Sequence, residues 1–150
     1  MRICFFGHRE FYRTPQIEEE LSLILRQITG KSDCEFFFGG YSGFDDLAYR
    51  CVNSISSPNK IKKLFVTPYI TEDYQKNVLT YKKYMYDGII YPEIERTPYR
   101  YAISARNKWI IDNCDSVICY INHSYGGAFA AVKRAKNSKK TIINLGKLDI

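Results

Sequence analysis

The sequence lacks a long apolar run, and this absence excludes a membrane-spanning helix. No stretch approaches the roughly 18 consecutive apolar residues that such a helix needs, and the first apolar run stops at Gly7. We therefore expect neither a signal peptide nor a membrane span. The five cysteines are an odd number and include no CxxC pair, which is typical of a reduced, cytoplasmic protein rather than of a disulfide framework.

The sequence also lacks the patterns of most metal, cofactor and nucleophile sites. Its two histidines, His8 and His123, have no partners at ligand spacing, so no metal is expected. No cysteine has an obvious histidine and carboxylate beside it to make it a nucleophile. The stretch GGYSG at 39–43 matches neither the GxGxxG dinucleotide loop nor the GxxxxGK phosphate loop, so no cofactor is predicted.

Positive charge exceeds negative charge, and the net value of +6 would suit an anionic partner. Much of the excess lies in Lys60–Lys63 and in the segment KRAKNSKK at 133–140. The second segment has two interpretations. It is either the solvated face and last turn of a helix, where cations suit the helix dipole, or a patch that binds nucleic acid.

Short apolar runs alternate with amphipathic segments along the chain. The runs predict strands, and the segments with apolar residues at helical spacing predict helices. The expected strands span 2–7, 34–39, 61–68, 88–91, 116–121 and 140–145, and the expected helices span 15–30, 44–54, 74–84, 103–114 and 128–137. This order predicts a parallel sheet covered by helices on both faces. The length of 150 residues, without a linker or repeat, favours one domain over 1–150.

The segment 69–101 is rich in tyrosine and is the least regular part of the pattern. It holds eight of the thirteen tyrosines, namely Tyr69, Tyr74, Tyr81, Tyr84, Tyr86, Tyr91, Tyr99 and Tyr101. Core packing is the simpler interpretation of these side chains. A lid that stacks on a base is the alternative.

Three loops that follow predicted strands contain glycines together with polar or charged side chains. The first strand ends in Gly7-His8-Arg9, the second in the stretch 39–43, and the strand at 116–121 in NHSYGG at 122–127. In an open parallel sheet, ligands bind beyond the carboxyl ends of the strands, where helix N-termini point unpaired N–H groups outward. We therefore expect a binding site at this edge of the sheet.

The glycine turns have both a structural and a functional interpretation. Ser42 and Asp45 have the spacing of a capping box, with aspartate in the third position. Capping does not account for Gly40 and Gly43, whose missing side chains permit positive φ and let a ligand approach the backbone. Gly126-Gly127 repeats the arrangement at a second helix start, so the two turns together predict a phosphate cradle.

Among the charged and titratable candidates, Arg106 and His8 allow two interpretations each. Arg9 would complete an anion pocket, whereas Arg106 is either a surface salt bridge or a phosphate clamp. His8 either packs beside its turn or hydrogen-bonds a ligand. Asp45 and Asp46 would repel a phosphate, so one of them is better suited to a ribose hydroxyl or a base edge.

Four stretches together resemble the SLOG superfamily. They are FFGHRE (5–10), FFGGYSGFDDLA (37–48), ARNKWIIDNCDSVICYI (105–121) and YGGAFAAVKRAK (125–136). That superfamily joins the DNA-processing protein A (SMF) proteins to the Lonely-guy cytokinin-activating enzymes, and the match is to its small stand-alone bacterial branch. The resemblance spans nearly the whole chain. It implies a Rossmann-like, three-layer α/β/α sandwich that binds a nucleotide or nucleotide-derived ligand across the glycine turns.

The resemblance implies eleven ligand-facing positions. They are Gly7, His8, Arg9, Gly39, Gly40, Gly43, Asp45, Arg106, Asn107, Gly126 and Gly127. Two departures matter. The family commonly has threonine where this chain has Ala128, and the Lonely-guy hydrolases carry a catalytic glutamate where it has Ala131. The missing glutamate favours binding over catalysis, and Asp45 is the candidate acid if the protein is an enzyme.

Three functions stay open on these observations. The first is a cytoplasmic sensor or carrier of a nucleotide-derived small molecule, such as an ADP-ribose-like ligand. The second is a nucleotide N-glycoside hydrolase or phosphoribohydrolase that uses Asp45. The third, ranked last, is single-stranded DNA binding, which the DNA-processing relatives and the positive charge suggest. Pairing as a homodimer is also implied by the resemblance.

Overall fold

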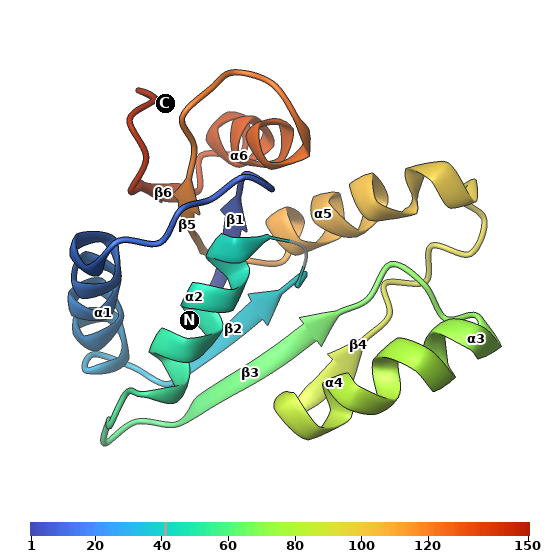
Figure 1. The fold of residues 1–150 in the computed structure, drawn as a ribbon, viewed down its shortest axis with the longest axis horizontal. Coiled ribbons are helices and arrows are strands. Elements are labelled where there is room, and N and C mark those ends of the chain that lie inside the picture. Colours follow the sequence, from blue (N-terminus) through green and yellow to red (C-terminus); the bar gives the residue numbers. More distant parts are fainter. Residues whose placement is uncertain (41) are drawn as a thin grey trace.

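The computed structural model describes residues 1–40 and 42–150 and places a parallel sheet between two layers of helices (Figure 1). Tyr41, part of the predicted glycine turn, lies outside the described residues. The strands follow the order β4-β3-β2-β1-β5-β6, and each neighbouring pair is parallel. They are β1 (Arg2–Gly7), β2 (Cys34–Phe38), β3 (Ile61–Val66), β4 (Gly88–Ile90), β5 (Ser116–Tyr120) and β6 (Thr141–Asn144). The predicted Rossmann-like α/β fold is confirmed.

Helices cover both faces of this sheet. One face carries α1 (Pro15–Thr29), α2 (Gly43–Asn53) and the helical segment 72–85, whose buried side chains share a core cluster. The other face carries α5 (Ala102–Asp112) and α6 (Gly127–Asn137), which share a second cluster. A short 3-10 turn, η2 (Tyr99–Tyr101), leads into α5. The sheet is therefore the middle of three layers.

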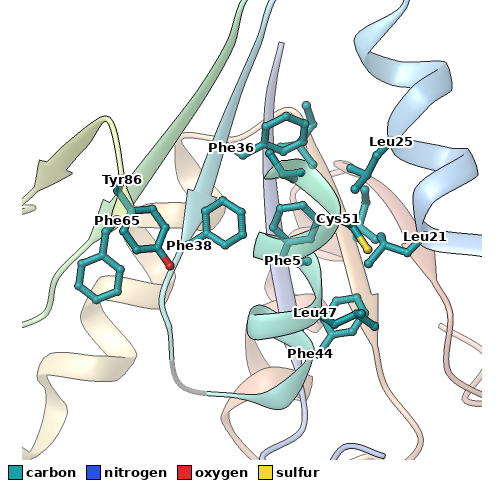
Figure 2. Close-up of a cluster of buried hydrophobic side chains, with 14 of the residues drawn as sticks. Phe5, Leu21, Leu25, Phe36, Phe38, Phe44, Leu47, Cys51, Phe65 and Tyr86 are labelled. Atoms are coloured by element: carbon teal, nitrogen blue, oxygen red, sulfur yellow. The ribbon is translucent and has the colours of Figure 1, made fainter. Parts of the chain in front are cut away.

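The central strands are apolar because both of their faces are buried. Phe5, Phe36 and Phe38 pack toward α1 and α2 (Figure 2), whereas Cys4 and Phe37 belong to the cluster under α5 and α6. The ring of Phe5 stacks on the rings of Phe38 and Phe36, with centroids 5.0 and 5.8 Å apart. Such two-sided burial produces the continuous runs in the sequence and fixes where each strand lies.

Local signals also set the helix starts. Thr14 caps α1, because its side chain accepts a hydrogen bond from the backbone N–H of Ile17 at 3.2 Å, and Pro15 follows at the first helical position. The predicted bounds of all elements except the helix at 74–84 agree with the structure to within two residues. Hydrophobic spacing and caps therefore account for most of the element boundaries.

The sequence predicts one regular helix over 74–84, but the structure has three helical pieces there. The segment comprises α3 (Glu72–Tyr74), a π-helical turn η1 (Gln75–Leu79) and α4 (Thr80–Met85). The hydroxyl of Thr80 donates to the carbonyl oxygen of Gln75, five residues earlier, at 2.9 Å. Sequence periodicity does not reveal an inserted residue of this kind, because a π-turn shifts the helical register by one position.

The tyrosines of segment 69–101 do not share one environment. Tyr86 is buried in the core beside Phe38 and Phe65 (Figure 2), as the core-packing interpretation predicts. Tyr84 is 89% exposed, and Tyr99 and Tyr101 are also exposed. Core packing therefore describes only part of this segment.

Gly7, at the carboxyl end of β1, is fixed by packing against α2. A Cβ atom at this position would overlap the Cβ of Phe44 and lie 2.9 Å from its Cγ. Phe44 is fully buried, so its ring has no space into which it can retreat. The glycine therefore lets the first turn of α2 approach the strand closely.

We expect Gly7→Ala to lower the free energy of unfolding by about 1–3 kcal/mol, because the added methyl group overpacks the contact with Phe44. Urea denaturation measures this change. Gly127→Ala is the matched control, since a Cβ at Gly127 meets nothing within 4 Å. Equal stability of Gly7→Ala and the wild type would contradict the close contact.

Candidate functional site

A cavity of about 490 Å³ opens at the carboxyl edge of the sheet, between the ends of β1 and β5. The chain runs outward from β1 to β4 and then returns to place β5 on the other side of β1, so the cavity lies at the topological switch point. Its lining includes most of the predicted ligand-facing residues, namely Gly7, His8, Arg9, Gly39, Asp45, Arg106, Asn107, Gly126 and Gly127. The loops that the sequence placed at one edge thus do come together.

Gly40 and Gly43 are predicted site residues that do not line this cavity. Gly40 has a φ of +73°, and a Cβ there would lie 2.8 Å from the ring of Phe65. Gly43 opens α2, and a Cβ there would contact Phe11 at 3.4 Å. The turn and the packing around it account for these two glycines, and their contact with a ligand stays a prediction.

The α2 side of the cavity is acidic and capped. The hydroxyl of Ser42 accepts from the Asp45 backbone N–H at 3.1 Å, and the Asp45 carboxylate accepts from the Ser42 backbone N–H at 3.2 Å and hydroxyl at 2.8 Å. The predicted capping box is confirmed. Asp45 is buried and lines the cavity, so this helix start presents a carboxylate to the cavity.

The α6 side of the cavity is open and has no side-chain cap. Gly126 stands at the N-cap position with a φ of +93°, and the part of the chain that the structure describes provides no side-chain cap hydrogen bond here. A Cβ at Gly126 or Gly127 would meet nothing within 4 Å, so both backbones face empty space. The first N–H groups of an α-helix lack intrahelical partners, and at α6 they are accessible to an anion.

Arg106 forms the floor between these two sides. It is 2% exposed, so it does not form the surface salt bridge that was one of the two interpretations of the sequence. Its Nη1 donates to the carbonyl oxygens of Val66 at 2.8 Å and Gly39 at 3.2 Å, and its Nε donates to the Asn107 side chain at 2.9 Å. The guanidinium thus ties α5 to the carboxyl ends of β2 and β3 while lining the cavity.

Three stacked rings form the wall that joins β1 to the α6 loop. His8 stacks on His123 with centroids 3.4 Å apart, and His123 stacks on Tyr125 with centroids 3.7 Å apart. The Nε2 atom of His8 accepts hydrogen bonds from the backbone N–H groups of Asn122 at 3.0 Å and His123 at 3.4 Å. His8 is 6% exposed, whereas Tyr125 at the outer end is 70% exposed. The stack therefore ends in an aromatic face open to a ligand.

The environment of His8 favours its neutral form. Burial lowers the pKa of His8 below the ordinary 6.5, and the neighbouring His123 lowers it further. Because Nε2 accepts two N–H groups, the ring proton lies on Nδ1. Among the described residues, none accepts a hydrogen bond from this Nδ1.

We expect stability to fall as the pH drops below 6.5. A lowered native pKa means that the unfolded chain binds more protons in this window, so stability present above pH 6.5 is lost as the pH falls through the native pKa of His8. Urea denaturation at pH 7.5 and 5.5 measures the loss, and His8→Asn should lose less. An NMR titration that places the His8 pKa above 6.5 would contradict this reasoning.

Sequence reasoning missed part of the lining. His123 and Tyr125 were noted within NHSYGG, but a pattern of residues gives no sign that His123 stacks on His8 and Tyr125 on His123. Glu10 and Ile103 also line the cavity. Ala131, at the position of the hydrolase glutamate, is buried in the core cluster under α5 and α6.

The described residues contain no helix long and apolar enough to cross a bilayer. They also contain no group of three or more histidine, cysteine or acidic side chains placed to hold a metal ion.

No family model and no curated protein match the chain. Among solved structures it is similar to DNA processing protein A (DprA) from Streptococcus pneumoniae, with 16% identity and a TM-score of 0.64, over 95% of this chain and 49% of that one. It is also similar to DprA from Helicobacter pylori, whose structure concerns single-stranded DNA binding, with 19% identity and a TM-score of 0.66, over 99% of this chain and 66% of that one. This chain thus spans about half of the streptococcal protein, and the likeness shows a shared fold.

Proposed function

We propose that the protein binds single-stranded DNA and that the cavity at the carboxyl edge holds one nucleotide of the strand. The observation that carries this proposal is the presence, in one cavity, of an uncapped helix start and an exposed aromatic face. Backbone N–H groups at the start of α6 suit a phosphate. The exposed ring of Tyr125 suits a stacked base, and such stacking tolerates any sequence.

The charges that line the cavity determine the orientation in which the nucleotide would bind. Arg9 and Arg106 supply positive charge, and the Nδ1–H of His8 is available as a donor. Asp45 holds a carboxylate on the α2 side, where it would repel a phosphate. The phosphate therefore belongs on the α6 side, and the α2 side is left for a sugar hydroxyl or a base N–H group.

The comparison with solved structures supports DNA as the source of the nucleotide. The Helicobacter pylori protein, which shares the fold over 99% of this chain, is described as binding single-stranded DNA. This likeness favours the function that the sequence alone ranked last. A strand can enter and leave the cavity because it is open and its outer ring, Tyr125, is exposed.

Neither basic segment, 60–63 or 133–140, contributes a residue to the lining of this cavity. The backbone N–H of Lys60, just before β3, donates to the Asp33 side chain, and Lys140 stands just before β6. Both positions are at the amino edge of the parallel sheet, opposite the cavity. The cavity lining includes two cations, Arg9 and Arg106, so we expect binding to depend only weakly on salt.

We expect Gly127→Glu to abolish binding of a fluorescent oligothymidine, because the new carboxylate enters the space that a phosphate would occupy. Fluorescence anisotropy measures the affinity. Ala130→Glu is the matched control: it adds the same charge to the same helix at an exposed position that does not line the cavity. We expect the control to bind as the wild type does.

Two outcomes would contradict this site. One is equal affinity in Gly127→Glu and Ala130→Glu. The other is a steep dependence on salt: one nucleotide in the cavity brings one or two phosphates, which give a slope of about −0.7 to −1.4 in a plot of log affinity against log salt. A slope several times steeper would assign binding to the basic segments at the amino edge.

We expect Tyr125→Ala to weaken oligonucleotide binding by about 5- to 150-fold, since stacking contributes about 1–3 kcal/mol per base. Tyr84→Ala is the control, because Tyr84 is exposed on α4 and does not line the cavity. The same anisotropy titration compares the two variants. Equal affinities would remove Tyr125 as the stacking face.

A free nucleotide-derived ligand is the second candidate, because a cavity of about 490 Å³ falls within the roughly 300–1,000 Å³ of small-molecule sites. Native mass spectrometry with AMP, ADP-ribose and NAD tests it. A bound mass, together with no affinity for the oligonucleotide, would replace the first proposal with this one. A released base in the same spectrum would indicate hydrolysis, with Asp45 as the acid.

A further inference from the structure

Two cysteines that are 110 positions apart in the sequence meet in the core under α5 and α6. The thiol of Cys4, on β1, donates a hydrogen bond to the sulfur of Cys114, and the two sulfur atoms are 3.2 Å apart. Both side chains are buried. Cys114 stands in the connection between α5 and β5, and its neighbour Asp115 exchanges two hydrogen bonds with the backbone of Arg2. The pairing of β1 with β5 thus fixes the position of Cys4 on the first strand and of Cys114 just before the second.

Cys114 borders a second cleft, which opens at the amino edge of the sheet. This cleft measures about 460 Å³ and has a polar lining that includes Arg2, Asp112 and Lys140. The ammonium group of Lys140 donates to the carbonyl oxygen of Cys114 at 2.7 Å. The hydrogen bond from Cys4 and the charge of Lys140 lower the pKa of the Cys114 thiol, whereas burial raises that of Cys4. Cys114 is therefore the more readily ionised sulfur and the one nearer to solvent.

We propose that Cys4 and Cys114 form a redox-active pair, which a peroxide converts reversibly into an intramolecular disulfide. The inference is independent of the function proposed for the carboxyl-edge cavity. The sulfur atoms need to approach by about one ångström, because a disulfide bond is about 2.05 Å long. Cys114 enters the reaction from the amino-edge cleft, and Cys4 resolves the intermediate from within the core.

The reaction balances in two steps. The Cys114 thiolate attacks one oxygen of hydrogen peroxide, the O–O bond breaks, and the departing hydroxide takes a proton to become water, leaving a sulfenic acid on Cys114. The sulfur of Cys4 then attacks the sulfur of this sulfenic acid. The S–O bond breaks, and the hydroxide leaves with the Cys4 proton as a second water. Two thiols are oxidised by two electrons, and one peroxide is reduced to two waters.

The other three cysteines serve as internal controls. Cys34 donates to the backbone oxygen of Ser32, and Cys51 accepts from the Ser22 hydroxyl. Burial raises the pKa of Cys119 to about 12. Among the described residues, the hydrogen bond between Cys4 and Cys114 is the one that joins two sulfur atoms. Oxidation should therefore be confined to one pair out of five buried thiols.

The experiment treats the folded protein with hydrogen peroxide, removes the oxidant, unfolds the chain and counts its thiols. We expect three of the five thiols to remain, a loss of two hydrogen atoms at the disulfide-linked peptides, and full recovery of thiols with a reductant. Cys4→Ala and Cys114→Ala should each form no internal disulfide, whereas Cys119→Ala should still form it. Retention of all five thiols in the wild type would overturn the proposal.

A single substitution in the pair can disturb folding, so a second variant leaves both cysteines of the pair in place. The triple variant Cys34→Ala/Cys51→Ala/Cys119→Ala keeps only the proposed pair. We expect it to lose both thiols to peroxide at the wild-type rate and to resist urea better when oxidised, because the bond closes a long loop of the unfolded chain. If the triple variant keeps its thiols, or if its disulfide joins two molecules, the inference is wrong.

Discussion

The buried guanidinium of Arg106 is the interaction around which the carboxyl edge is arranged. A charge at 2% exposure is tolerated only where its N–H groups are satisfied, and here Val66, Gly39 and Asn107 supply the acceptors. These contacts hold the middle of α5 over the ends of β2 and β3. They also set the depth of the cavity, since Gly39 has no side chain that would push the guanidinium away.

The two helix starts that face this cavity have opposite character for a simple reason. Ser42 and Asp45 accept each other's backbone N–H groups at the start of α2, so the turn offers a carboxylate. Gly126 provides no side chain to cap α6, so the backbone N–H groups stay accessible. One cavity thereby acquires a side suited to a phosphate and a side suited to hydroxyl or N–H donors. In the proposed function, this polarity would orient the bound nucleotide without reading its base.

The two edges of the sheet differ in chemistry. At the carboxyl edge, glycine backbones, Arg106 and the stacked rings of His8, His123 and Tyr125 surround an open cavity. At the amino edge lie most of the clustered lysines and the paired sulfurs of Cys4 and Cys114. A parallel sheet makes this separation unavoidable, because each residue that ends a strand lies at one edge and each that precedes a strand lies at the other.

The sequence by itself determined the element order, the parallel sheet and the loops that form the site. Apolar runs with both faces buried, helical spacing and caps such as Thr14 and Ser42 are local signals, and they act within a few residues of each element. The carboxyl-edge location of Gly7, Asp45 and Gly126 follows from strand direction alone. The π-turn at 75–79 escaped this reasoning, because the segment is too short for its apolar spacing to reveal a shift of one position in the helical register.

Only the tertiary structure decided what each marked residue touches. The sequence suggests that Gly7 and Gly40 both face a ligand. In the structure, a Cβ at Gly7 would lie too close to Phe44, and a Cβ at Gly40 would lie too close to Phe65. Arg106 points inward and donates a hydrogen bond to Gly39, which is 67 positions away in the sequence. His123 donates its backbone N–H to His8, which is 115 positions away. Such contacts depend on how layers pack, and packing is a property of three-dimensional neighbours rather than of spacing along the chain.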